Sequence, residues 1–308
     1  MISTKIKSLF IALGISSSAL AQDADSLLNQ LGGNQKHDAL TATFKASRII
    51  FTQSTETEKK YDLNFLISHR FGDIGGDFGS SHTLWGLDIA QDLYIGFDYG
   101  ITSKLTAGIG RSKHNELYNF FLKQKMLEQT KTFPVNATLF AQAGIIAREE
   151  NSVNEFANGS DRNSYFLQAL VSRKFSSAFS LQGSVGYLAR PVGSEANDEK
   201  GLLSLGLAGR LKVTKRMALV GDYQFSNISR PDNLINTYYN SLGAGLEIET
   251  GGHVFALNFC NAPYINENNY IAETLKSWTD GGVRFGFTIS RNFTLHKSKN
   301  PDINSKIY

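Results

Sequence analysis

The residues of this sequence that could act as a nucleophile, a base or a metal ligand are few and widely spaced. Its six histidines include no pair with the close spacing of a metal site, and Cys260 is the single cysteine. We therefore predict no metal site, no intrachain disulfide and no cofactor. Ser68 and His69 are an adjacent Ser–His pair within a predicted strand, but neighbouring strand residues point to opposite faces. They cannot serve as nucleophile and base for each other, and we predict no catalytic residue.

Charged residues that recur at alternating positions are more informative. Along 283–295, Val283, Phe285, Phe287 and Ile289 alternate with polar residues. This period of two indicates a strand with one apolar and one polar face. The same alternation elsewhere puts a set of charged side chains on polar faces: Arg70, Asp98, Arg148, Lys174, Arg190, Arg210, Lys212, Asp222, Glu247, Glu249 and Arg284.

Thirteen segments carry a strand signal. They are 41–51, 60–71, 91–100, 104–113, 115–126, 133–147, 162–174, 178–190, 201–213, 216–226, 239–249, 252–261 and 282–295. The links between them alternate in length, with tight links at 100–103, 176–178, 214–215 and 250–251. Long links lie at 148–161, 191–200, 227–238 and 262–281. Short turns at one end and long loops at the other are typical of an outer-membrane barrel.

A secreted β-sandwich would also show alternating strands, with the apolar face turned inward. Three observations favour a membrane barrel instead. The strands approach the 9–11 residues that a tilted membrane strand needs, the polar faces are rich in Gly, Ser, Asn and Gln, and the loop lengths alternate. We therefore predict an all-β, transmembrane, antiparallel up-and-down barrel.

The number of strands is a separate question, because a bacterial single-chain barrel has an even number. Twelve strands result if 41–51 is not part of the wall, and fourteen result if a further strand lies within 81–90. We favour twelve.

The N-terminus predicts export. Lys5 and Lys7 precede a short apolar stretch, and Ala19-Leu20-Ala21 gives a small-x-small cleavage pattern. Residues 1–21 are therefore predicted to be a signal peptide. We expect 22–40 to be a periplasmic lead-in and 41–308 to be an outer-membrane barrel of a Gram-negative bacterium. The net charge of +3 argues against a nucleic-acid partner.

Several short stretches resemble a known family. They are FKASRII (44–50), ISHRFG (67–72), GLD (86–88), DYGIT (98–102), GIGR (108–111), SRKF (172–175), IETGGHVF (248–255), IAET (271–274) and RFGFTISR (284–291). Together they resemble the outer-membrane β-barrel proteins of gliding and gut-type Gram-negative bacteria that are classified as a domain of unknown function. The resemblance implies a barrel and an outer-membrane location, with no activity and no catalytic residues to transfer.

Two interpretations of the inward charges remain open. They either pair across a filled lumen or line an aqueous path, in which case the excess of Arg and Lys predicts weak anion preference. Aromatic residues in the link 262–281 could contact a ligand, fold into the lumen or merely pack: Tyr264, Tyr270 and Trp278. We expect a pore or transport-type channel for an unidentified small solute, in contact with outer-membrane lipid. The alternatives are a closed structural or ligand-binding barrel and, third, an outer-membrane hydrolase; protein partners remain open.

Overall fold

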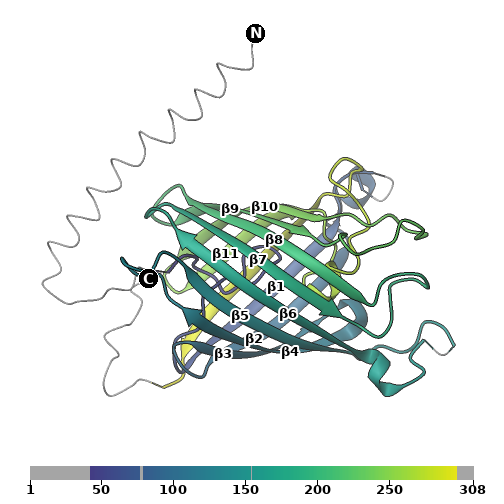
Figure 1. The fold of residues 1–308 in the computed structure, drawn as a ribbon. Helices are drawn as coiled ribbons and strands as arrows, with labels where there is room; N and C mark the ends of the chain where they lie inside the picture. The colour runs from purple at the N-terminus through teal and green to yellow at the C-terminus, as the bar shows by residue number, and fades with distance from the viewer. Residues whose placement is uncertain (1–41, 77–78, 154, 297–308) are drawn as a thin grey trace, which may run out of the picture.

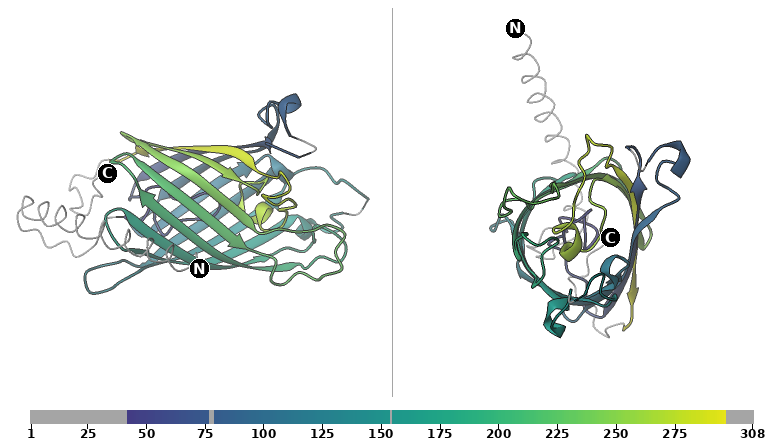
Figure 2. Two further views of the ribbon diagram at one scale, coloured as in Figure 1. Left: turned by 90° about the horizontal axis from the view of Figure 1, so that it is seen from above. Right: turned by 90° about the vertical axis from the view of Figure 1, so that its right-hand side faces the viewer.

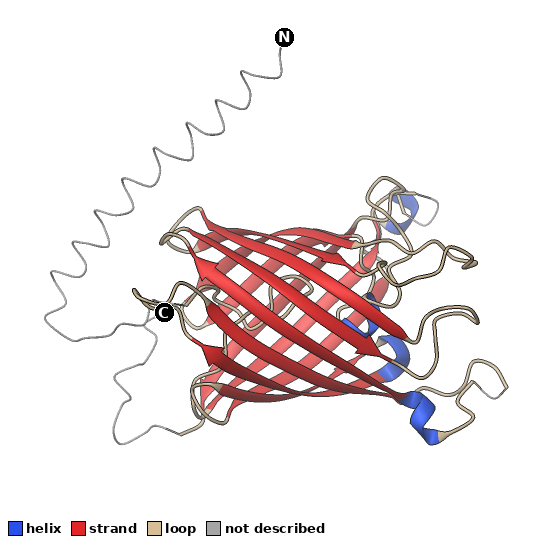
Figure 3. Ribbon diagram, in the orientation of Figure 1, coloured by secondary structure: helices blue, strands red, loops and turns tan. Residues whose placement is uncertain are grey.

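The computed structural model describes residues 42–76, 79–153 and 155–296, and twelve antiparallel strands close there into one barrel (Figures 1 and 3). The strands are β1 (Asp62–Asp73), β2 (Ala90–Gly100), β3 (Leu105–Ser112), β4 (Leu117–Leu127), β5 (Asn136–Ile146), β6 (Asn163–Lys174), β7 (Phe179–Ala189), β8 (Gly201–Lys212), β9 (Met217–Phe225), β10 (Ser241–Thr250), β11 (His253–Cys260) and β12 (Arg284–Thr294). Each strand pairs with its neighbours in sequence, and β1 pairs with β12 to close the ring.

The alternation of side chains sets the two faces of the wall. In β8, Leu205 and Leu207 are exposed on the outside, at 42% and 59% of their surface. Ser204 and Ala208 of the same strand are buried on the inside. Closure gives every strand a main-chain partner on both sides, so the barrel has no open edge in an apolar environment.

The two ends of the barrel differ. At the short-turn end, links such as 175–178, 213–216 and 251–252 join successive strands. At the long-loop end lie the links 74–89, 147–162, 190–200, 226–240 and 261–283. The short helices η1 (Ser81–Thr83), η2 (His114–Glu116) and η3 (Gly159–Arg162) lie in the links of this end, where Figure 3 shows them in blue.

The predicted fold class is confirmed, with twelve strands rather than fourteen. The segment 81–90 holds η1 and a turn, and only Ala90 belongs to β2. The strand predicted at 41–51 is wrong, because residues 42–51 do not belong to any wall strand. Among the described residues, no helix has the length and apolarity needed to span a membrane. The predicted signal peptide and the lead-in 22–40 lie outside the described residues.

The interior of the barrel is occupied by two segments of the same chain. We call residues 42–58 the strap and residues 261–274 the inner loop. The strap precedes β1, and the inner loop, with α2 (Glu267–Tyr270), connects β11 to β12. Figure 2 looks along the barrel in its right-hand view and shows both segments within the ring. Most of their residues are buried although neither segment belongs to the wall.

Candidate functional site

The strap folds into a small hairpin inside the lumen. Arg48 and Gln53 form an isolated antiparallel bridge, and the Ile49 amide donates to the Thr52 carbonyl at 2.9 Å. The tip of this hairpin is held by Asp222 of β9. One carboxylate oxygen of Asp222 accepts from the amides of residues 50, 51 and 52 at 3.3, 2.8 and 2.9 Å. Three amides converging on one carboxylate make a strong anchor, because hydrogen bonds to a charged group are stronger than neutral ones.

After the hairpin, the strap continues towards β1. Gln182 of β7 accepts from the Thr55 amide at 3.0 Å and donates to the Gln53 carbonyl at 2.8 Å. Thr138 of β5 donates to the Thr55 carbonyl at 2.9 Å. These wall side chains therefore satisfy main-chain groups that would otherwise be buried without partners.

The inner loop enters the lumen from the long-loop end and is fixed by its own set of polar contacts. The Asp92 carboxylate of β2 accepts from the Ile265 amide at 2.9 Å. Gln142 of β5 donates to the side-chain oxygens of Asn266 and Asn268 at 3.1 and 2.9 Å. Asn266 also caps α2 by accepting from the Asn268 amide at 3.0 Å. The loop is consequently a defined part of the interior rather than a surface link.

The strap and the inner loop meet in the lumen. Arg48 lies 3.2 Å from the Glu267 carboxylate, and Gln53 donates to the same carboxylate at 2.8 Å. The rings of Phe51 and Tyr270 pack with their centroids 5.4 Å apart. Glu267 and Tyr270 are completely buried, so the junction fills this part of the lumen with packed side chains.

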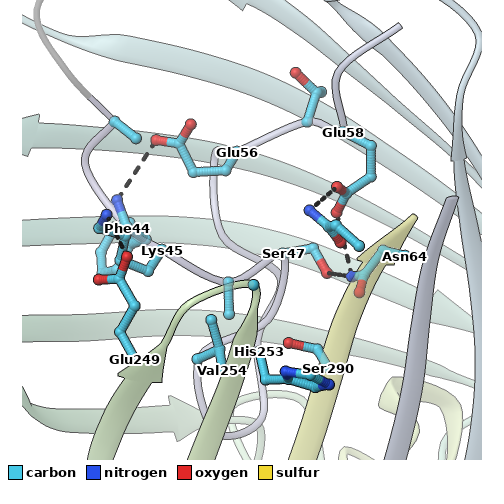
Figure 4. A pocket seen from close by; sticks show the side chains of 15 residues that line it. Phe44, Lys45, Ser47, Glu56, Glu58, Asn64, Glu249, His253, Val254 and Ser290 are labelled. Carbon is cyan, nitrogen blue, oxygen red and sulfur yellow. Dashed lines mark hydrogen bonds and ion pairs between the residues drawn. The ribbon is translucent and has the colours of Figure 1, made fainter. Parts of the chain in front are cut away.

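A cavity lies on each side of the junction. The cavity towards the short-turn end, of about 100 Å³, is shown in Figure 4. There Lys45 lies 3.1 Å from Glu249, and the Glu58 carboxylate accepts from the side-chain amides of Asn64 and Asn292 at 3.2 and 3.1 Å. The cavity at the long-loop end is larger, about 310 Å³, and α2 contributes Asn268 to its lining. The junction of the strap and the inner loop thus lies between a cavity near each end of the barrel.

Several charged residues predicted to face inward do lie in the lumen, and most of them are paired. Arg210 donates to Glu247 at 3.0 and 2.7 Å, and Arg284 lies 2.5 Å from Asp73. Asp98 accepts from the Ser47 hydroxyl of the strap at 3.1 Å. Arg70, which is 2% exposed, contacts the Sγ of Cys260, and its guanidinium carbon lies 5.6 Å from the centre of the Phe51 ring.

Four other predicted residues lie at the ends of the barrel. Arg148 and Arg190 fall beyond the last residues of β5 and β7, so alternation within a strand does not apply to them. They line the long-loop cavity and pair with Glu155 and Asp198. Lys174 and Lys212 are the last residues of β6 and β8 at the short-turn end. Lys174 donates to the Ala42 carbonyl at 3.4 Å, and Lys212 is exposed.

The aromatic residues of the link 262–281 take three different positions. Tyr264 stacks on His114 with 3.5 Å between the ring centroids. Tyr270 is completely buried against the strap, where no ligand can reach it. Trp278 donates from its indole nitrogen to the Leu242 carbonyl at 2.8 Å. The structure thus places Tyr270 in the lumen, and ligand contact by Tyr264 or Trp278 stays a prediction.

Sequence reasoning missed Arg48, Glu267 and the strap as lumen contents. A signal was present, since Ile49, Ile50 and Phe51 are consecutive apolar residues and would place apolar side chains on both faces of a strand. That pattern does not suit a wall with one polar face. Within the described ranges, no group of three or more His, Cys, Asp or Glu side chains is placed to hold a metal ion.

Comparison with known proteins places the chain in a family. The family model described as "Membrane bound beta barrel domain (DUF5777)" matches residues 44–293. The resemblance seen in the sequence is confirmed at this level. A comparison with curated proteins finds no match.

Solved structures with a similar chain path include three bacterial outer-membrane proteins. The NanC porin is 6% identical with a TM-score of 0.45, covering 76% of this chain and 100% of its own. The COG4313 outer membrane channel from Pseudomonas putida F1 is 12% identical with a TM-score of 0.41, covering 78% and 98%. The outer membrane protein Omp33 of Acinetobacter baumannii is 9% identical with a TM-score of 0.39, covering 76% and 99%. Similarity this low does not identify a shared activity.

Proposed function

This chain belongs to the membrane-bound β-barrel domain family, and on that premise we propose that it is a gated outer-membrane channel for small polar solutes, closed in the state described here. The strap is the gate in this proposal. Its displacement towards the short-turn end would join the two cavities past the inner loop.

The observation that carries the proposal is the independence of the wall from the strap. Every strand of the barrel has two main-chain partners, and all of them are other wall strands. The strap is covalently joined to the wall through β1, and the wall holds it through side chains such as Asp222 and Gln182. A segment attached in this way can leave without breaking the wall, and water can replace its polar contacts.

A second candidate function is a permanently closed barrel that acts through its ends. A specific observation favours it, because the lumen also contains an apolar cluster. Phe44, Ile50 and Phe51 of the strap pack with inward-facing wall residues such as Phe121 and Phe140. Complete burial of each such side chain contributes about 1.5–3 kcal/mol, which opposes opening.

A disulfide between strap and wall tests the proposal. The hydroxyl oxygens of Thr55 and Ser172 of β6 are 2.5 Å apart, so cysteines at both positions can form a bond. We would introduce Thr55→Cys and Ser172→Cys together with Cys260→Ala and record conductance in planar bilayers. The reduced protein is expected to show openings, and oxidation should abolish them. A matched control places cysteines at Ser68 and Thr288, which face each other between β1 and β12 with 2.8 Å between their oxygens.

The control disulfide stays within the wall, so its oxidation should leave conductance unchanged. A second variant, Asp222→Asn, removes the charged anchor of the strap and should increase the fraction of time that the channel is open. If the reduced protein and the Asp222→Asn variant fold as barrels but never conduct, the closed-barrel function is correct and the channel is rejected.

A further inference from the structure

The wall contacts the part of the strap that follows the hairpin through both its side chains and its main chain. Between residues 53 and 58, four wall side chains bind backbone groups. Gln182 donates to the Gln53 carbonyl and accepts from the Thr55 amide. Thr138 donates to the Thr55 carbonyl. Lys123 of β4 donates to the Glu56 carbonyl at 3.2 Å, and Thr106 of β3 accepts from the Glu58 amide at 2.8 Å.

We call these four side chains, which all contact the same stretch of the strap, the track. They come from β3, β4, β5 and β7, and each lies near the short-turn end of its strand. Thr106, Lys123, Thr138 and Gln182 are only 1–2% exposed, because the strap covers them. Each offers a donor or an acceptor where the strap presents the complementary backbone group. The track therefore recognises features that every polypeptide has.

We propose that the track is a binding site for a short peptide segment, and that the strap occupies it in place of that peptide. Its five hydrogen bonds go to three C=O groups and two N–H groups of the strap, which are groups that a polypeptide backbone carries. An oligosaccharide presents hydroxyl groups instead of amides. The inference rests on the proposed function in one respect only, since the strap has to leave before the track is free.

Competition between strap and peptide provides the test. The probe is a fluorescently labelled, uncharged peptide of eight Ser, Thr, Gln and Ala residues, and its binding to the full-length protein is followed by fluorescence anisotropy. The Thr55–Ser172 disulfide variant should bind the peptide when reduced and at least tenfold more weakly when oxidised. Thr55→Pro removes the amide that Gln182 binds and weakens the strap alone, so this variant should bind the peptide more tightly than the wild type.

The Thr55→Pro protein then serves as the background for changes in the track. Adding Gln182→Met removes one donor and one acceptor at similar size and should weaken peptide binding at least fivefold. Ser204→Ala is the matched control. Ser204 is also buried in the lumen, but its hydroxyl bonds to Gln224 rather than to the strap, so peptide binding should not change.

Three results would overturn the inference. These are equal binding to the oxidised and reduced proteins, binding restricted to a peptide with the strap's own sequence, and equal competition by a maltooligosaccharide of similar size. A reduced protein that conducts but does not bind the peptide rejects the track and leaves the channel standing. Peptide binding to a Thr55→Pro protein that never conducts rejects the channel and supports the track.

Discussion

Arg48 and Glu267 form a buried ion pair at 3.2 Å that joins two segments 219 positions apart in the chain. Arg48 lies on the strap, which precedes the first wall strand, and Glu267 lies on the inner loop before the last one. The pair is further enclosed by Tyr94, whose hydroxyl accepts from the Arg48 guanidinium at 3.2 Å. This contact connects the two segments that fill the lumen.

The first prediction concerns the strength of this pair. Glu267→Gln leaves the Arg48 guanidinium buried beside a neutral partner, which is expected to lower the free energy of unfolding by about 3–5 kcal/mol. Urea unfolding in lipid vesicles measures the loss. The exposed pair Arg111–Glu116 is the control, and Glu116→Gln should cost about 0–1 kcal/mol. Equal losses at the two sites would contradict the structural role of the buried pair.

The second prediction separates the anchors of the two lumen segments. Asp222→Asn should increase hydrogen exchange at the amides of residues 50–52 at least tenfold, since charged hydrogen bonds contribute about 1.5–3 kcal/mol. Asp92→Asn should instead increase hydrogen exchange at the Ile265 amide, which donates a hydrogen bond to the Asp92 carboxylate. If either variant loosened both segments equally, the anchors would not be independent.

The third prediction concerns the outer surface of the barrel. Leu205→Arg places a charge near the middle of β8 on the lipid side and is expected to cost about 2–4 kcal/mol. Leu211→Arg is the matched control, because Leu211 has a similar exposure (47% against 42%) but lies one residue from the end of the strand. It should cost about 0–1 kcal/mol near the interface. Equal tolerance, measured by unfolding in vesicles, would refute the assigned lipid face.

The fourth prediction is a pH dependence at the long-loop end. Hydrogen bonds from Arg148 hold the pKa of Glu155 below its ordinary value. Because the folded pKa is lowered, the contribution of Glu155 is complete above the ordinary value of about 4.3 and is lost as the pH falls through the folded value. The Asn151 amide, which donates to Glu155 at 2.6 Å, reports on this contact.

Hydrogen exchange of Asn151, normalised to the intrinsic rate at each pH, should therefore be slow at pH 6 and should become faster as the pH falls through the folded pKa of Glu155. The Glu155→Gln variant should exchange fast at pH 6 as well. If this variant kept the slow exchange of the wild type at pH 6, another contact would hold this loop.

The fifth prediction concerns ion selectivity once the channel conducts. Arg210 neutralises Glu247 inside the lumen, so Arg210→Gln leaves a carboxylate uncompensated there and should shift the reversal potential towards cation preference. Lys212→Gln removes a charge that is exposed at the end of the same strand and should cause a smaller shift. Equal shifts would indicate that the lumen charges do not face the permeation path.

The wall of this barrel was predictable because its two faces meet different environments. Leu203, Leu205 and Leu207 alternate with Ser204 and Gly206, and this contrast is present in the sequence before any contact forms. The boundaries of all twelve wall strands agree with the predicted segments within three residues. The requirement for an even number of strands excluded thirteen and left twelve and fourteen, of which twelve is correct.

The contents of the lumen were not predictable in the same way. Side chains of the strap meet protein on all sides, so apolar Phe51 and polar Thr52 are equally buried and no alternation results. The partners of Arg48 and Asp222 depend on which segments the closed ring brings together. The alternation of residues within one strand identified Asp222 as an inward carboxylate. It carries no information about which segment that carboxylate will contact.

The positions of the strap and the inner loop in the chain have a consequence for assembly. The strap leads directly into β1, and the inner loop leads through 275–283 into β12, and these two strands form the closing seam of the barrel. Arg48 can reach Glu267 only when the first and last parts of the chain have come together. Pairing of β1 with β12 brings the same two parts of the chain together, so sealing of the ring places the strap and the inner loop within reach of each other.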